Sequence, residues 1–208
     1  MNQKSVQRNK EVLKEHLDTL YQILSKIIQT FEFCDYLYKP INQEHFDFIN
    51  DDGFFRFSSY SMYRICFVDL HKLLSKSKND QFNLHELIDK LSINGVYYNK
   101  NISKDLIDKW KESLNDEEDI IKDIKDVRNK IYSHTDKDYK KVIERSEMTF
   151  DDIRRIIEKI KIILQEIHAL ALDTDVSQLY KPMYSKISVQ NIIQALIDQR
   201  QLKKKGKN

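Results

Sequence analysis

Apolar residues recur along most of this chain at the three- and four-residue spacing that marks one face of an α-helix. The clearest run covers about residues 4–33. A second covers about residues 58–74 and is apolar over much of its circumference, which is typical of a helix at the centre of a bundle. The only β-like segment, VYY at 96–98, is too short for a strand assignment. The pattern therefore predicts an all-α fold.

Residues that favour turns and helix caps predict where the other helices begin. Pro40 and Gly53 break the stretch between the two long helices, where a short helix is expected near residues 43–49. The predicted N-caps are Asn83 before residues 84–91, Ser103 before 105–114, Thr149 with its capping-box partner Asp152 before 150–172, and Ser188 before 189–202. Residues 120–132 are strongly periodic and 133–140 predict a break. The basic tail, 203–208, is expected to fray.

Composition adds little to this picture and excludes little. The net charge of +2 does not by itself call for a nucleic-acid partner. Cys34 and Cys66 form no CxxC motif, and residues 1–10 do not resemble a signal peptide, so we expect reduced core thiols in a cytoplasmic protein. No apolar run approaches the roughly 20 residues that span a bilayer, so no membrane association is expected.

The stretch RNKIYSHTD, residues 128–136, carries the most informative chemistry. If Ile131 is the centre of the apolar stripe and the helix persists to His134, Arg128 and His134 lie about 60° to either side of it. Arginine is a permanent cation that can bind a phosphate through two hydrogen bonds, whereas histidine titrates near neutral pH. Asn129 is polar and can orient the arginine or contact a phosphate.

Other residues near these positions allow more than one interpretation. Asp136 would orient His134 or merely cap a turn. Arg64 and His71 share one face of the second long helix, and Asp69 is close to them in sequence but is not obviously their partner. We interpret Arg64 and Asp69 as partly buried and ion-paired, with orientation of Arg128 as the alternative.

The sequence predicts neither a metal nor a cofactor. His16, His45, His85 and His168 are scattered and lack the spacing of metal ligands. No glycine-rich phosphate-binding motif is present either.

The segment RNKIYSH resembles the signature of HEPN domains, in which Arg is followed by Asn, Asp or His and, after a few more residues, by His. The preceding helix with RICFVDLHKLL and the long helix that follows are similar in arrangement to the abortive-infection branch of that superfamily. The likeness covers about residues 5–175. It implies a HEPN-like four-helix bundle core with additional N- and C-terminal helices, divided into a domain at 1–175 and a C-terminal helix and tail at 176–208.

The resemblance also implies a function, namely a dimeric, metal-independent endoribonuclease in phage defence, abortive infection or a toxin–antitoxin system. Arg128 would stabilise charge on the phosphate, His134 would transfer protons and Asn129 would orient the arginine. The implied partners are RNA, a second copy of the chain, and an antitoxin or nucleotidyltransferase. The toxin subgroup that nucleotidyltransferases modify carries Tyr two residues after the His, where this chain has Asp136. The alternative is a non-catalytic helical module that binds a protein partner or RNA through the same face.

Overall fold

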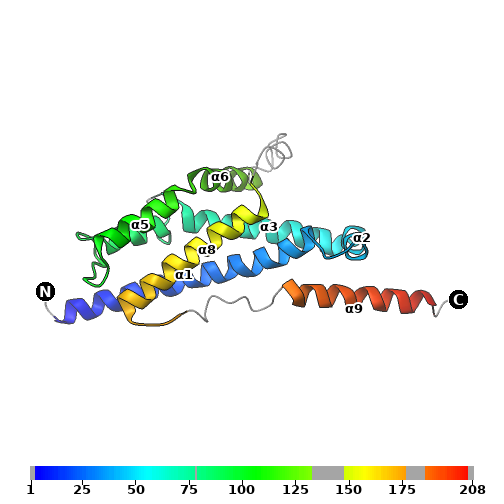
Figure 1. The fold of residues 1–208 in the computed structure, drawn as a ribbon, viewed down its shortest axis with the longest axis horizontal. Coiled ribbons are helices and arrows are strands. Elements are labelled where there is room, and N and C mark those ends of the chain that lie inside the picture. The colour runs from blue at the N-terminus through cyan, green and yellow to red at the C-terminus, as the bar shows by residue number, and fades with distance from the viewer. Residues whose placement is uncertain (1–2, 78, 133–147, 177–185, 206–208) are drawn as a thin grey trace. The chain divides into compact units, whose positions relative to one another are not determined.

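The computed structural model describes residues 3–77, 79–132, 148–176 and 186–205, and throughout these ranges the secondary structure is helical, with no strand (Figure 1). The all-α prediction is therefore confirmed. The helices are α1 (Gln3–Tyr38), α2 (Gln43–Asp51), α3 (Gly53–Leu74), α4 (Leu84–Leu91), α5 (Lys104–Asn115), α6 (Glu118–Tyr132), α8 (Phe150–Ile167) followed by a π-helical turn η1 (His168–Leu172), and α9 (Lys186–Lys205).

Three predicted N-caps are confirmed in atomic detail. The side chains of Asn83 and Ser103 accept hydrogen bonds from the backbone N–H groups of Glu86 and Leu106. Thr149 and Asp152 form both hydrogen bonds of a capping box. Each of these local signals marks the start of its helix correctly.

Three helix boundaries differ from the sequence prediction. Helix α1 continues to Tyr38 and ends just before Lys39 and Pro40, because the proline rather than the end of the leucine stripe stops it. Helix α3 begins at Gly53, five residues earlier than expected. Helix α9 begins at Lys186, so Ser188 lies inside its first turn and is not the cap.

The basic tail also differs from expectation in part. Lys203, Lys204 and Lys205 belong to the last turn of α9, where cations are favoured near the helix C-terminus. The remainder of the tail, and the predicted break at 133–140, lie outside the described residues.

The chain divides into two compact units, Met1–Ile27 with Phe67–Lys181, and Ile28–Cys66 with Pro182–Asn208. Helices α1 and α3 contribute one part to each unit. The buried residues of the first unit include Leu17, Leu20 and Leu24 of α1, together with residues of α3, α4 and α8. Trp110 of α5 donates a 2.6 Å hydrogen bond from Nε1 to Glu166 of α8, which ties these two helices together.

The second unit has its own apolar cluster, formed by Tyr36, Leu37, Ile49, Phe55, Val189, Ile193 and Ile197. Next to this cluster, the fully buried His45 of α2 is hydrogen-bonded on both ring nitrogens, to the Tyr36 hydroxyl at 2.5 Å and to Gln194 of α9 at 2.7 Å. The two bonds fix the histidine between α1 and α9, which explains its burial without a catalytic or metal role. Both cysteines, Cys34 and Cys66, are also buried here as free thiols, as expected.

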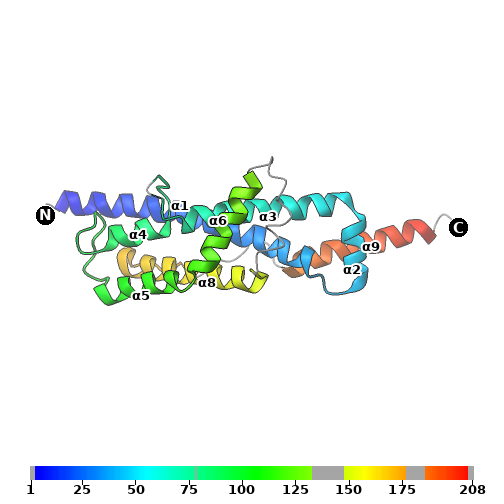
Figure 2. The same cartoon turned by 90° about the horizontal axis from the view of Figure 1, so that it is seen from above.

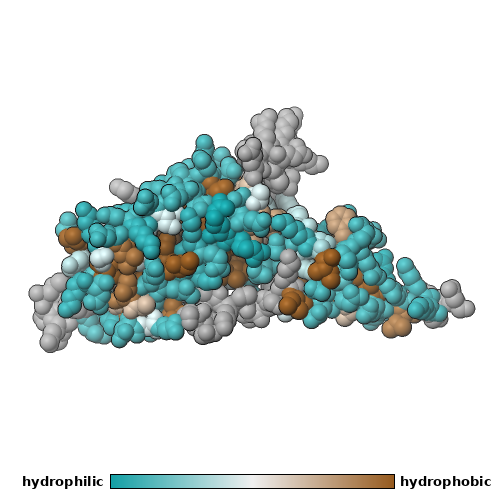
Figure 3. All heavy atoms as spheres, viewed as in Figure 1, coloured by the Kyte–Doolittle hydropathy of each residue, from teal (hydrophilic) through white to brown (hydrophobic). Residues whose placement is uncertain are grey.

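The surface of the described helices is largely hydrophilic on the face that Figure 3 shows, with separate hydrophobic groups between the hydrophilic ones. None of the described helices combines the length and apolarity needed to cross a bilayer.

Candidate functional site

Arg128 and Asn129 lie in the last described turns of α6, beside its buried face. Ile124 and Val127 of the apolar stripe are buried, Arg128 is half-buried and Asn129 is exposed. Arg128 therefore borders the apolar stripe, as the helical angles predict. Its Nη1 donates a 3.0 Å hydrogen bond to Oδ1 of Asn129. The contact that an orienting role requires is present, and the role itself stays a prediction.

His134 and Asp136 lie outside the described residues. Helix α6 is described as helical to Tyr132, two residues before His134. The predicted pairing of Arg128 with His134, and of His134 with Asp136, is therefore not tested by the geometry.

Asp69 and Arg64 belong to different compact units of the chain. Asp69 is buried and forms 2.9 Å ion pairs with Lys26 of α1 and Lys72 of α3. Asp69 is thus held by two lysines, and its alternative role, the orientation of Arg128, stays a prediction. The Arg64 guanidinium lies 5.4 Å from the centroid of the Tyr60 ring, the geometry of a cation–π contact.

A pocket of about 520 Å³ lies between the C-terminal end of α3 and helix α6, and Figure 2 shows α6 crossing α3. Its walls are His71 and Leu74 of α3, the following residues Ser75, Lys76, Ser77 and Asp80, and Glu118, Ile121, Lys122, Lys125 and Arg128 of α6. The structure thus brings Arg128 together with a histidine, His71, more than 50 positions away in the sequence.

The side chains that line this pocket carry a net positive charge. The four cations Lys76, Lys122, Lys125 and Arg128 outnumber the two carboxylates, Asp80 and Glu118. Lys76 and Glu118 neutralise each other in a 2.5 Å ion pair. Lys122 and Lys125 form no ion pair with any described carboxylate, so their charges are available to an anion in the pocket.

The pocket also sets the protonation state of His71. Burial lowers the pKa of its imidazole, and the nearby positive charges of Arg128 and Lys125 lower it further, against an opposing effect of Asp80. The neutral form is therefore favoured at neutral pH. Among the described residues, none forms a hydrogen bond with the His71 ring, so the ring is not committed to a structural contact there.

The sequence pattern did not mark His71 as a functional residue. Its only local signal was the shared face with Arg64, which pointed to a helix interior. The position of His71 in the last turn of α3 brings it next to α6, and only the packing of α6 reveals this. The spacing of residues within α3 or within α6 does not indicate that His71 and Arg128 lie in the same pocket.

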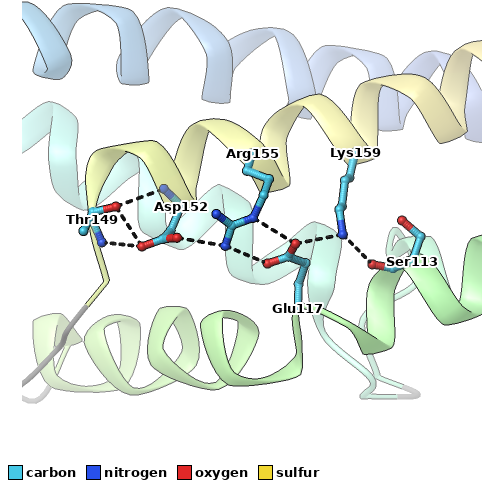
Figure 4. A network of polar contacts seen from close by, with 6 residues as sticks. All are labelled: Ser113, Glu117, Thr149, Asp152, Arg155 and Lys159. Carbon is cyan, nitrogen blue, oxygen red and sulfur yellow. Dashed lines mark hydrogen bonds and ion pairs between the residues drawn. The ribbon is translucent and has the colours of Figure 1, made fainter.

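A polar network fixes where α6 begins (Figure 4). Glu117, buried in the turn between α5 and α6, accepts hydrogen bonds from Nε and Nη2 of Arg155 at 3.0 and 3.2 Å and pairs with Lys159 at 2.8 Å. Arg155 also contacts Asp152 of the capping box at 2.8 Å. Lys159 reaches the backbone oxygen of Ser113 in α5. The network joins the start of α6 to α8 and so orients the helix that carries Arg128.

Burial alone would raise the pKa of the Glu117 carboxyl. The hydrogen bonds and charges of Arg155 and Lys159 outweigh that effect, and the net result is a lowered pKa. Glu117 is thus a carboxylate at neutral pH, with both oxygens bound by cations. Its role is structural.

The described residues include no cluster of three or more His, Cys, Asp or Glu side chains that could hold a metal ion. What the pocket offers is a set of cations beside a neutral imidazole. Such a set suits an anionic, phosphate-bearing ligand.

Comparison with known proteins decides the family. The sequence model of the family HEPN_AbiU2, described as AbiU2, matches residues 10–191. The chain belongs to the HEPN_AbiU2 family. The match includes Arg128 and Asn129, the pocket and the segment with His134, and it confirms the HEPN resemblance at the level of the family. No curated protein and no solved structure matches the chain.

Proposed function

We propose that this HEPN_AbiU2 protein is a metal-independent endoribonuclease of phage defence, either in abortive infection or in a toxin–antitoxin system. The observation that carries the proposal is the R-N-x4-H motif of an AbiU2-type HEPN chain, whose arginine lies in α6 and lines a cationic pocket. Membership of the HEPN_AbiU2 family supports the proposed class, a HEPN protein of phage defence. The pocket supports an anionic substrate.

The chemistry follows from the nature of RNA. Each phosphodiester has a neighbouring 2′-hydroxyl, whose oxygen can attack phosphorus once its proton is removed. Arg128 would bind the phosphoryl oxygens and stabilise the charge that develops on them, held in place by Asn129. His134 would transfer a proton, a function typically worth about 10²–10⁴-fold in rate.

One histidine cannot easily act as both acid and base in a single step. A homodimer that faces His134 with the same residue of its mate would supply both groups, and a two-fold axis is the commonest symmetry of homo-oligomers. We therefore propose a homodimer with RNA as substrate. An antitoxin or nucleotidyltransferase partner and a cytoplasmic location stay predictions.

The alternative is a non-catalytic HEPN module that uses the same cationic pocket to hold RNA or an acidic protein segment. Expression in a bacterial host separates the two functions. A ribonuclease slows growth when the wild-type chain is induced, and His134→Ala relieves that effect at an equal level of folded protein. If both chains leave growth unchanged and bind RNA equally well, the binding module is supported instead.

A further inference from the structure

The HEPN motif supplies one histidine per chain, and the pocket beside Arg128 holds another. His71 and Arg128 line the same cavity from different helices, α3 and α6. The cavity volume of about 520 Å³ is within the range of small-molecule sites and has room for a phosphate with its ribose. An RNA strand whose phosphate is bound by Arg128 would therefore bring a sugar near the His71 ring.

The surroundings of His71 suit a proton acceptor better than a phosphate-binding cation. Its ring is half-buried, faces the cavity and forms no hydrogen bond with a described residue. The charged groups around it are Arg128, Lys125, Lys122 and Glu118 of α6, Lys76 and Asp80 after α3, and Lys72 on its own helix, which is paired with Asp69. Because the ring is half-buried and cations predominate around it, the neutral imidazole is favoured and can accept a proton.

We propose that His71 is the general base of the ribonuclease and accepts the proton of the RNA 2′-hydroxyl in this pocket. This inference rests on the proposed ribonuclease function. The O–H bond breaks and its proton moves to a ring nitrogen of His71 while the 2′-oxygen bonds to phosphorus. The bond from phosphorus to the 5′-oxygen then breaks, and that oxygen takes a proton from the acid, the role left to His134. The products are a 2′,3′-cyclic phosphate and a free 5′-hydroxyl.

The assignment changes what the dimer has to do. If His71 supplies the base, a second His134 is not needed as the base, and only the role of the acid is left to the histidine of the motif. Lys122 and Lys125 would hold the flanking phosphates, because neither is neutralised by a described carboxylate.

The test compares initial rates of transfer-RNA cleavage in EDTA between about pH 5 and 9 for wild type, His71→Asn and His85→Asn. His85 is the matched control, since it is also half-buried with a lowered pKa but lines a different cavity. We expect His71→Asn to lose about 10²–10⁴-fold in rate and to lose the rise in rate on the acidic side of the profile. His85→Asn should keep both.

A second measurement uses the wild-type chain, so that it does not depend on the folding of His71→Asn. The NMR signal of His71 is assigned from its absence in the His71→Gln variant. The ring signals of ¹³C-labelled histidines are followed by NMR while an uncleavable 2′-O-methyl RNA oligonucleotide is added. We expect the His71 signal to shift and its pKa to rise, because a nearby phosphate favours the imidazolium. An unmoved His71 signal with the oligonucleotide bound would overturn the assignment.

The two proposals fail in different ways. If wild type cleaves RNA, His134→Ala does not, and His71→Asn matches wild type in rate and pH profile, only the role of His71 is refuted. If folded wild type cleaves no RNA under any of these conditions, the ribonuclease function fails and the base assignment fails with it.

Discussion

At the scale of single residues, Arg128 combines a fixed charge, a half-buried position and a side-chain hydrogen bond to Asn129. The guanidinium is planar, and the directions of its N–H groups match the geometry of a phosphate. A lysine at the same position would keep the charge of the pocket and lose that planar contact.

We therefore predict that Arg128→Lys lowers kcat for RNA cleavage by about 10²–10³-fold and changes RNA affinity by much less. The measurement is kcat from cleavage kinetics, together with Kd for an uncleavable RNA from fluorescence anisotropy. Equal losses in kcat and affinity would show instead that Arg128 contributes only to binding.

Lys122 and Lys125 are expected to act on affinity rather than on chemistry, because their charges face the same pocket without described carboxylate partners. The double variant Lys122→Ala with Lys125→Ala should weaken RNA binding and reduce the slope of log Kd against log salt by about 2, one for each phosphate contact. Lys161→Ala is the control, since Lys161 of α8 is paired with Glu158 at 2.6 Å. An unchanged salt dependence in the double variant would place the RNA elsewhere.

Single residues also show what the sequence can and cannot reveal. The caps at Asn83, Ser103 and Thr149 were predictable because each bonds to a backbone group three residues away. The position of His71 beside Arg128 was not predictable, because the two residues are on different helices and no local sequence pattern indicates that these helices pack together. The RNKIYSH motif was informative for a different reason, because it resembles the signature of HEPN domains and its interpretation does not depend on helix geometry alone.

At the scale of the helices, α6 depends on a buried carboxylate for its position. Glu117 links the start of α6 to Arg155 and Lys159 of α8, and these cations are partly exposed. Loss of the charge would leave two cations without their shared partner.

We predict that Glu117→Gln lowers the free energy of unfolding by about 2 kcal/mol at neutral pH, as hydrogen bonds to a charged group are lost. Urea denaturation measures the change. The control Glu158→Gln removes a half-exposed carboxylate from an i,i+3 pair with Lys161 and should cost well under about 1 kcal/mol.

The cost of Glu117→Gln should depend on pH. The folded state lowers the pKa of Glu117, so its contribution is complete above the unfolded pKa, near 4.5, and is lost as the pH falls through the folded value. The difference in stability between wild type and Glu117→Gln should therefore shrink below about pH 4.5. A difference that grows in acid would contradict the assignment of Glu117 as a bound carboxylate.

The ends of the helices explain why some boundaries were missed. The apolar stripe of α1 loses its regularity after Phe31, yet Cys34, Tyr36 and Leu37 remain buried in the second unit and keep the helix going. Helix propagation stops only where Pro40 restricts the residue before it. Tertiary burial therefore extends the helix beyond Phe31 and the proline ends it, while the stripe pattern located only the middle of the helix.

At the scale of the whole molecule, the chain forms two compact units, and the proposed catalytic pocket lies within the first. The core of the second unit is held by α9, whose Ile193 is completely buried while its neighbour Ile192 is 58% exposed. These adjacent isoleucines offer a test of the division into units.

We predict that Ile193→Ala destabilises the second unit by about 2–5 kcal/mol, the usual cost of removing a buried Ile side chain. Native-state hydrogen exchange should show faster exchange in α2 and α9, with α4, α5 and α8 little affected. Ile192→Ala should leave all of these helices unchanged. Uniform loss of protection across both units would mean that they unfold as one.

The central claim is that this HEPN_AbiU2 chain cleaves RNA without a metal. The most direct measurement incubates total RNA and transfer RNA with purified wild-type and His134→Ala protein in EDTA, after circular dichroism has shown that both fold alike. We expect cleavage by the wild-type chain alone. Absence of RNA cleavage by both proteins would contradict ribonuclease activity under these conditions and favour the binding module. Equal cleavage by both would contradict the place of His134 in the reaction.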